Sequence, residues 1–250
     1  KDGYQQSAPV TDSQVAEESQ AAEAKVETGP SVAVLPFVNM SGDAENEYFS
    51  DGLTETLLHM LAQLPELRVA ARTSSFAFKD KPDAGIEEIS KALGVAHILE
   101  GSVQKAGNRV RVTAQLIRAN DGYHVWSQNY DRTLDDIFAI QDEIANDVAN
   151  ALGSSLLSAT DQPMHGVSTT NAMAYEDYLK GMEQQAIYSY TSLAVAEGHF
   201  KDALARDPDF AEAKMALARN YALKLETGLI EYEEASAAAL PLLQQVREQN

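Results

Sequence analysis

The residues of this chain that could bind a metal ion are five histidines and one short acidic run, and neither has the spacing of a metal site. No two histidines lie four residues apart, the interval that would place a pair on one face of a helix. Asp43, Glu45, Glu47 and Asp51 match ligand positions of a calcium-binding loop, but Tyr48 stands where such a loop needs glycine. We therefore expect no bound metal, and a solvated acidic loop that leads into a helix.

Nucleophilic and acid–base chemistry also lack a complete motif. Ser50-Asp51-Gly52 has the residue types of a nucleophile or phosphate motif, but it lacks the second glycine and the lysine that those motifs need. Adjacent carboxylates such as Asp135-Asp136 are predicted to lie on helices, where neighbouring side chains point apart. The absence of cysteine excludes disulfides and cysteine nucleophiles. The sequence thus predicts a region without catalytic residues and without a cofactor.

The charge of the chain limits its partners. The sequence has 19 basic and 38 acidic residues, a formal net charge of −19. DNA and RNA binding needs a basic surface that replaces the counterions of phosphates, so nucleic acid is excluded as a partner of this region. No run of about 18 apolar residues could cross a membrane, and no hydrophobic region of an export signal is present. Any membrane anchor is therefore expected upstream of Lys1.

Three consecutive antiparallel strands, predicted over residues 97–132, organise the fold. Gly107-Asn108 suits a two-residue hairpin loop, and Asn120-Asp121-Gly122 suits a three-residue loop with its glycine in the left-handed conformation. These turns predict the register, because a slip of one residue would turn every side chain to the wrong face. The pairs predicted on the apolar face are Val103 with Val112, Gly101 with Ala114, Leu99 with Leu116, Trp126 with Leu116, and Tyr130 with Val112. Trp126 is expected to be largely buried in this register.

The segments before and after these strands complete an α/β domain. Residues 32–37 form an apolar run typical of a strand that is buried on both faces, and residues 67–71 are predicted to be a second, parallel strand. Residues 48–64 between them have the apolar spacing of a helix, whereas residues 73–84 are predicted to be a loop. A long helix is predicted directly after the meander, with Thr133 or Asp135 as its N-terminal cap. We expect a mixed sheet with helices mainly on one face, ending in an antiparallel meander.

The end of the chain is predicted to be entirely helical. Ala196, Phe200, Ala203 and Pro208 follow the order of small, aromatic, small and proline residues in the 34-residue tetratricopeptide repeat (TPR). The first helix of this unit is expected over residues 175–186, with an enlarged loop around residues 188–190. A second unit opens at Phe210. Because such units bury their faces only against neighbours, we expect the array to be truncated at residue 250.

Several stretches of the chain resemble one known domain family. They are SVAVLPF at residues 31–37, YFSDGL at 48–53, residues 93–132, and IFAIQDEIA at 137–145. These sequence segments resemble the TolB amino-terminal-like domain, which is commonly followed by TPR repeats in bacterial membrane signalling proteins. The resemblance implies an α/β domain without known catalytic residues. It also implies an effector ahead of a membrane helix, either a winged-helix DNA-binding domain, a nucleotide cyclase or a protein kinase.

Together these features predict four segments, namely a flexible acidic linker (1–29), a TolB-like α/β domain (31–157), a linker (158–169) and TPR-like helices (170–250). The expected function is a non-catalytic interaction or sensory module in the periplasm, as the extracytoplasmic portion of an inner-membrane signalling protein. A transmembrane transcriptional regulator is the first expectation for the parent. The alternatives are an adenylate or guanylate cyclase or a protein kinase, and an envelope assembly or scaffold protein.

Two surfaces are the candidate binding sites for a protein or peptide partner. One is the polar face of the meander, which carries Arg109, Arg111 and Gln115 and is alternatively only the solvated side of the sheet. The other is the concave groove of the repeats, where Tyr178 and Tyr221 are expected. Stacked helix pairs present extended grooves to peptides, so the groove is the stronger of these two hypotheses.

Overall fold

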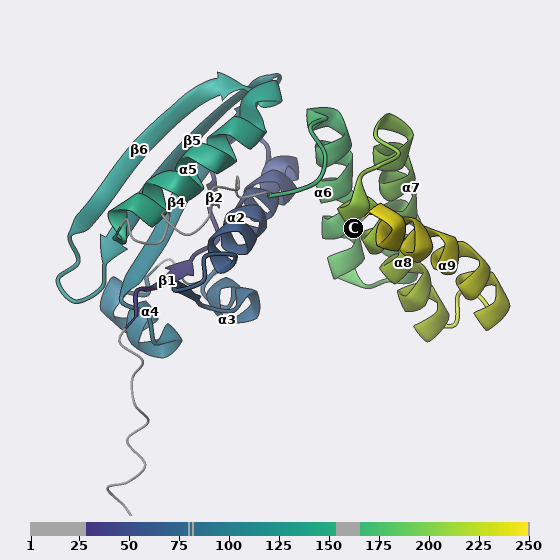
Figure 1. Cartoon of the computed structure of the whole chain (residues 1–250), viewed down its shortest axis with the longest axis horizontal. Coiled ribbons are helices and arrows are strands. Elements are labelled where there is room, and N and C mark those ends of the chain that lie inside the picture. The colour runs from purple at the N-terminus through teal and green to yellow at the C-terminus, as the bar shows by residue number, and fades with distance from the viewer. Residues whose placement is uncertain (1–28, 80, 82, 154–165, 250) are drawn as a thin grey trace, which may run out of the picture.

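The computed structural model describes residues 29–79, 81, 83–153 and 166–249 (Figure 1). Its first part is a mixed α/β fold, and its second part is entirely helical, as the sequence predicts. The predicted linker over residues 1–29, except its last residue, lies outside the described residues, as does most of the linker over residues 158–169. Within the described ranges, no helix combines the length and apolarity needed to span a bilayer.

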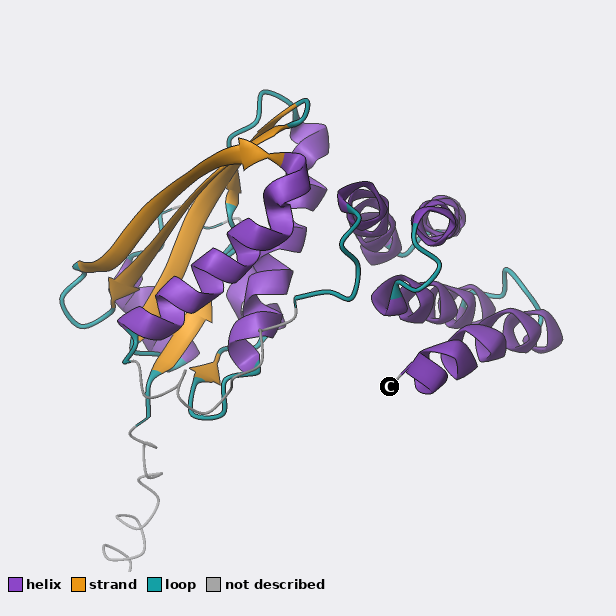
Figure 2. Cartoon of the chain, turned by 45° about the horizontal axis from the view of Figure 1, so that its top comes forward, coloured by secondary structure: helices purple, strands orange, loops and turns teal. Residues whose placement is uncertain are grey.

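A six-stranded sheet forms the frame of the α/β part (Figure 2). The strands are β1 (Ser31–Val34), β2 (Val38–Asn39), β3 (Arg68–Val69), β4 (His97–Ala106), β5 (Arg109–Arg118) and β6 (His124–Thr133). Their order is β3-β1-β4-β5-β6, with β2 paired to β4. β1 is parallel to β3 and β4, whereas β4, β5 and β6 form the predicted antiparallel meander.

The predicted register of the meander is confirmed. Val103 lies opposite Val112, and Leu116 lies opposite Trp126, so one face of the three strands is apolar. Gly107 and Gly122 have φ angles of 58° and 72°, which only glycine adopts at little cost. The prediction of a three-residue loop at 120–122 is wrong, because Arg118 donates its N–H to the carbonyl of Tyr123, which leaves four residues in the loop. A bulge beyond Leu116 compensates for the additional residue, so the predicted pairs hold. The expectation that Trp126 is largely buried is wrong, because its side chain lies on the edge strand β6, where it packs against the core but is only partly buried.

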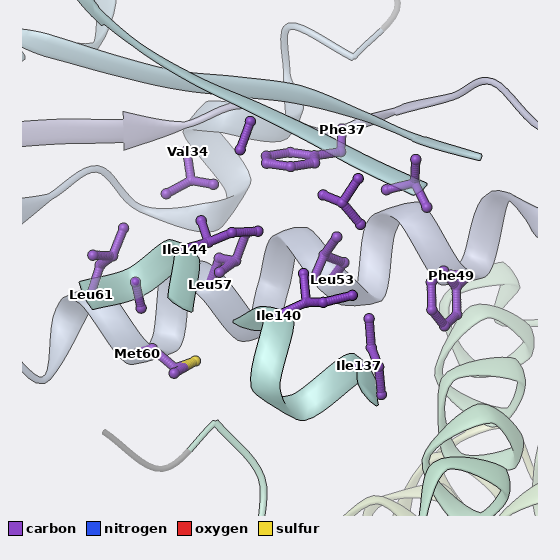
Figure 3. Close-up of a cluster of buried hydrophobic side chains, with 14 of the residues drawn as sticks. Val34, Phe37, Phe49, Leu53, Leu57, Met60, Leu61, Ile137, Ile140 and Ile144 are labelled. Atoms are coloured by element: carbon purple, nitrogen blue, oxygen red, sulfur yellow. The ribbon is translucent and has the colours of Figure 1, made fainter. Parts of the chain in front are cut away.

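Two helices cover one face of the sheet, as expected. They are α2 (Glu47–Ala62), which follows the short turn η1 (Ala44–Asn46), and α5 (Ile137–Ala151), which follows the short turn η2 (Leu134–Asp136). Figure 3 shows Leu53 and Leu57 of α2 together with Ile140 and Ile144 of α5 in the core beneath the sheet, all of them fully buried or nearly so. Of the two predicted caps, Thr133 is the one that precedes η2 and α5, because its side chain and that of Asp136 form a capping box.

The opposite face is covered near the start of β4 by α4 (Ile86–Leu93), where Ile89 packs against Leu35 and Ile98. The prediction of a loop from residue 73 is wrong at its start, because α3 (Arg72–Phe76) lies there. A helix this short shows no apolar periodicity in the sequence. The guanidinium of Arg72 lies 4.1 Å from the centre of the Phe76 ring, which favours the turn.

The helical part consists of two hairpins, one of α6 (Ala172–Ile187) with α7 (Tyr190–Arg206), and one of α8 (Ala211–Glu226) with α9 (Tyr232–Gln249). The predicted enlarged loop around residues 188–190 is wrong. Only Tyr188 and Ser189 separate the first two helices, because α6 runs to Ile187 and α7 already begins at Tyr190. Tyr188 takes the left-handed conformation that ends α6, and the Ser189 hydroxyl caps α7.

The two parts share one hydrophobic core. Ala172, Tyr175 and Leu179 of α6 are buried in the same cluster as the side chains of α2 and α5. The segment that enters α6 is anchored as well, because Ser168 donates a hydrogen bond of 2.6 Å to Glu212 of α8 and Thr169 donates one of 2.6 Å to Asp207. The first helical hairpin is thus fixed against the α/β part.

Candidate functional site: a cleft between the two parts

A cleft of about 590 Å³ lies between the α/β part and the helical hairpins. Helices α2 and α3 supply one wall, and α6 and α8 supply the other. The charged side chains and the methionine that line the cleft are Asp51, Glu55, Arg72, Met182, Glu183 and Arg219. Because its walls come from four separate helices, the cleft exists only when both parts of the chain are folded and docked.

A close approach of two helices sets the floor of the cleft. Gly52 of α2 lies against Leu179 of α6, where a Cβ atom on residue 52 would come within 2.3 Å of the leucine side chain. The hydroxyl of Tyr175 lies 2.8 Å from that of Thr56 and accepts a hydrogen bond of 3.0 Å from Gln141. These contacts hold the two walls of the cleft in one arrangement.

A second junction closes one side of the cleft. Glu176 accepts hydrogen bonds from Tyr48 at 2.8 Å and from Lys105 at 2.9 Å, and it forms an ion pair with Lys180 at 2.9 Å. Burial raises the pKa of Glu176, but the hydrogen bonds from Lys180, Lys105 and Tyr48 outweigh it and lower the pKa to about 2. Burial raises the pKa of the Tyr48 phenol, and the carboxylate of Glu176 raises it further. Glu176 therefore stays charged and Tyr48 stays protonated at neutral pH.

The α2 wall carries charges that are already paired. The carboxylate of Asp51 lies 2.5 Å from the ammonium of Lys79, which also contacts Glu47 at 2.8 Å. Glu55 pairs with Arg72 of α3. Burial raises the pKa of Asp51, although the hydrogen bond from Lys79 opposes this shift. This wall holds its own counterions and has little charge left for a ligand.

The α6 and α8 wall carries charges that have no counterion. Glu183 of α6 and Arg219 of α8 form no ion pair with any residue that the structure describes. Burial raises the pKa of Glu183, a hydrogen bond with Gln184 opposes this, and the nearby Asp51 carboxylate raises it again. The partly buried side chain of Met182 precedes Glu183 in the same wall. This wall therefore offers one carboxylate and one guanidinium beside an apolar surface.

The structure places the residues predicted on the meander away from the cleft. The side chains of Arg109 and Arg111 are exposed and both pair with Asp131. Gln115 lies on the same face, where it is paired with Glu100 on β4 and with Ser127 on β6. These residues form a polar surface beside the edge of the sheet, with a shallow hollow around Arg109, Arg111 and Asp131.

The two tyrosines predicted in the repeat groove have different surroundings. The ring of Tyr178 lies 5.0 Å from that of Phe210 and 6.2 Å from that of Phe200, so it joins the two hairpins. The hydroxyl of Tyr221 donates a hydrogen bond of 3.0 Å to Glu197 of α7. Both side chains thus contact neighbouring helices, and neither lines the cleft.

The sequence did not reveal Glu183 and Arg219, the two charges of the cleft that lack counterions. Each lies on a helix whose exposed face carries many other charged residues, and neither belongs to a motif. Only the docking of α6 on α2 distinguishes them. No group of three or more histidine, aspartate or glutamate side chains within the described ranges is arranged to hold a metal ion.

No protein-family model matches the chain. Over 191 residues it is 42% identical to a protein of Rhizobium meliloti (strain 1021) named "Putative adenylate cyclase 3", an alignment that covers 75% of this chain and 32% of that protein. The chain thus spans about a third of the length of this relative.

Solved structures are similar to about half of the chain. TolB from Acinetobacter baumannii has a TM-score of 0.38 and 14% identity, covering 51% of this chain and 29% of that chain. Lipoprotein GNA1162 from Neisseria meningitidis has a TM-score of 0.38 and 18% identity, covering 48% of this chain and 99% of that chain. The C-terminal domain of LpoB from Escherichia coli has a TM-score of 0.34 and 19% identity, covering 48% and 94%.

Proposed function

We propose that this chain is the protein-binding, sensory region of a membrane-anchored bacterial signalling protein, that it lies outside the cytoplasm, and that its parent is a nucleotide cyclase. The name of the Rhizobium relative supports a cyclase parent over the transcriptional regulator that the sequence first suggests. The region itself is proposed to bind a partner and to carry out no catalysis. The resemblance of its strand and helix sequences to the TolB amino-terminal-like domain supports the proposed extracytoplasmic location.

The helical hairpins support the proposal that α6 to α9 are TPR units. Phe200 of α7 is fully buried against Gly181 of α6, where a Cβ atom would lie 2.5 Å from the phenylalanine ring. Ala196 and Ala203 on either side are fully buried as well, and Pro208 follows the end of α7. Small residues around one aromatic plug are the packing that this repeat uses.

The observation that carries the proposed function is that Glu183 and Arg219, two charges of the cleft, form no ion pair with any residue that the structure describes. An extended segment of a partner that reaches from Glu183 to Arg219 could place a basic group at one and an acidic group at the other. Its apolar side chains could contact Met182 and the exposed Ile187. These contacts all lie on the helical part, and the α2 and α3 wall bounds the ligand on its other side, so its binding free energy depends on the arrangement of α2 against α6.

Photo-crosslinking in the parent protein tests the cleft as a binding site. A photoreactive phenylalanine analogue replaces Ile187, which is 59% exposed at the cleft, or Leu240, which is 63% exposed on α9 and serves as the matched control. We expect a covalent adduct from position 187 and none from position 240. Arg219→Glu should abolish this adduct, whereas Arg247→Glu, which reverses an exposed arginine on α9, should leave it unchanged. Equal adducts from both positions would contradict the proposal.

The proposed location and parent are tested separately. Because this chain has no cysteine, Tyr232→Cys in a single-cysteine parent introduces one thiol at a side chain that is 70% exposed. A membrane-impermeant maleimide should label it in intact spheroplasts, and labelling only after lysis would contradict an extracytoplasmic location. Cyclic nucleotide formation by the parent should change with Arg219→Glu and remain unchanged with Arg247→Glu.

A further inference from the structure

Strand β6 is an edge of the sheet that no described residue covers. Among the described residues it pairs with β5 alone, and it is 10 residues long (Figure 1). The bulge lies near its start, so from Trp126 to Thr133 the strand is regular. Proteins protect such edges with proline, charged residues, bulges or short strands; β6 has no proline or lysine, carries Asp131 and Arg132, and is bulged only near its start. A long regular edge is a template for a further strand.

The backbone groups available at this edge follow from the register. Leu134 donates its backbone N–H to Asn108 at 2.9 Å, which identifies the pairs that exchange hydrogen bonds with β5. Since such pairs alternate along an antiparallel ladder, the even-numbered residues of β6 bond to β5. The N–H and C=O groups of Ser127, Asn129 and Asp131 therefore point outward, and the side chains of all three are exposed.

The charges on either side of the edge differ in sign. On the helix side, α5 carries Asp142, Glu143 and Asp147 and no basic residue. Glu143 and Asp147 lie over β6, because Glu143 contacts Arg132 at 3.0 Å and Asp147 accepts a hydrogen bond of 3.2 Å from Tyr130. On the polar face of the sheet, two arginines share the single carboxylate of Asp131. The helix side thus presents Glu143 and Asp147 against Arg132, whereas the polar face presents two arginines against Asp131.

We propose that the β6 edge binds an extended segment of a partner protein by strand addition, and that the side chains of this segment facing α5 are basic. The outward groups of Ser127, Asn129 and Asp131 supply the main-chain hydrogen bonds. Because side chains alternate along a strand, lysine or arginine at every second position faces Glu143 and Asp147. The side chains between them face the meander surface with its two arginines and are neutral or acidic.

A second copy of this chain fits the same edge less well. Pairing of β6 with its own copy around a two-fold axis brings α5 beside the α5 of the other copy on the same face of the joined sheet. Each helix then presents Glu143 and Asp147 to a helix without basic residues. The net charge of −19 adds a repulsion that a basic partner does not meet.

Nuclear magnetic resonance of the ¹⁵N-labelled full chain tests the proposal with a synthetic probe, acetyl-Thr-Lys-Val-Lys-Thr-Lys-Val-Lys-Thr-amide. At millimolar peptide we expect the amides of Ser127, Asn129 and Asp131 to shift and to exchange with solvent more slowly. The amides of Gln128 and Tyr130, which already bond to β5, should change little. The single tryptophan of the chain, Trp126, lies in β6 and gives an independent fluorescence signal.

Matched controls separate charge from strand addition. A peptide with glutamate in place of lysine should bind at least about tenfold more weakly, since it meets the acidic groups of α5. Glu143→Lys should reduce this preference, whereas Glu87→Lys, an exposed charge reversal on α4, should not. Equal binding of both peptides, or no change at the three outward amides, would overturn the proposal. A self-associated dimer in sedimentation with the same amides protected would overturn it in favour of a second copy.

Discussion

The hydroxyl groups of Tyr175 and Thr56 lie 2.8 Å apart, although 119 residues separate them in the sequence. Tyr175 is nearly fully buried, and its ring packs on that of Phe138 at 5.4 Å. Its hydroxyl also lies 3.4 Å from the carbonyl oxygen of Gly52. A helix of the helical part thus completes the polar pairing inside the α/β core, so the cleft between the two parts has fixed walls.

Removing this hydroxyl should destabilise the fold without creating a large cavity. Tyr175→Phe leaves the amide of Gln141 and the hydroxyl of Thr56 without their partner in a buried position. We expect the free energy of unfolding to fall by about 1–3 kcal/mol. Urea denaturation measures this change, and Tyr232→Phe, at an exposed position, serves as the control. Equal stability of the two variants would show that the hydroxyl is not paired in the folded protein.

The contact between Gly52 and Leu179 predicts that Gly52→Ala destabilises this protein, although the same substitution stabilises an isolated helix. On an isolated helix, alanine is favoured over glycine by about 1 kcal/mol. In this chain the new methyl group would lie 2.3 Å from the Leu179 side chain, and overpacking costs about 1–3 kcal/mol. We therefore expect Gly52→Ala to lower the free energy of unfolding.

The same substitution should stabilise the protein once Leu179 is shortened. Leu179→Ala removes the atoms that the new methyl group would meet, so Gly52→Ala in that background should regain the helix propensity of alanine. A double-mutant cycle measured by urea denaturation gives the coupling energy of the two residues. Additive effects would contradict the close packing of α2 on α6.

Phe200 predicts how strongly the first helical hairpin depends on one side chain. It is fully buried between α6 and α7, with its ring against Gly181. Phe200→Ala should cost about 3–5 kcal/mol of unfolding free energy, since little can collapse into the space of the ring. A loss below about 1 kcal/mol would contradict the role of Phe200 as the plug of a TPR unit. Thermal or urea denaturation of the full chain measures the change.

The sheet was predictable because its determinants are local. The two-residue turn at Gly107-Asn108 determines the pairing of β4 with β5, whereas the turn before β6 is one residue longer than predicted and a bulge compensates for it. The loop before α7 was predicted wrongly because a spacing difference of three residues can lengthen either a loop or a helix. The structure shows that the helices take the additional residues, since α6 runs to Ile187 and α7 already begins at Tyr190.

The cleft could not be predicted because no local pattern encodes it. The sequence predicts Tyr178 and Tyr221 in the groove of the repeats. Aromatic side chains at helical spacing pack equally well against neighbouring helices, as both tyrosines do in the structure. Glu183 and Arg219 become distinct only in the folded chain, where the docking of α6 on α2 places both at the cleft, although Arg219 stays exposed. A contact between residues more than a hundred positions apart, such as Tyr175 with Thr56, leaves no trace in the pattern of a single sequence.

The junction between Glu176 and Lys105 predicts how stability depends on pH. The pKa of Glu176 falls from its usual value near 4.5 to about 2 in the folded protein, because its hydrogen bonds from Lys180, Lys105 and Tyr48 outweigh burial. A carboxylate whose pKa is lowered by folding stabilises the folded state above its unfolded pKa. Its contribution is therefore present at neutral pH and is lost as the pH falls from about 4.5 to about 2.

Glu176→Gln should remove this part of the pH dependence. At pH 7 we expect a loss of about 1–3 kcal/mol in unfolding free energy, since the side chain of Lys105 is only 11% exposed and loses its counterion. Below pH 2 the variant and the original chain should differ little, because Glu176 is then mostly protonated in both states. Glu87→Gln, at an exposed carboxylate, is the control and should follow the original curve. A difference between Glu176→Gln and the original chain that stays constant from pH 7 to pH 2 would show that Glu176 acts through packing and not through its charge.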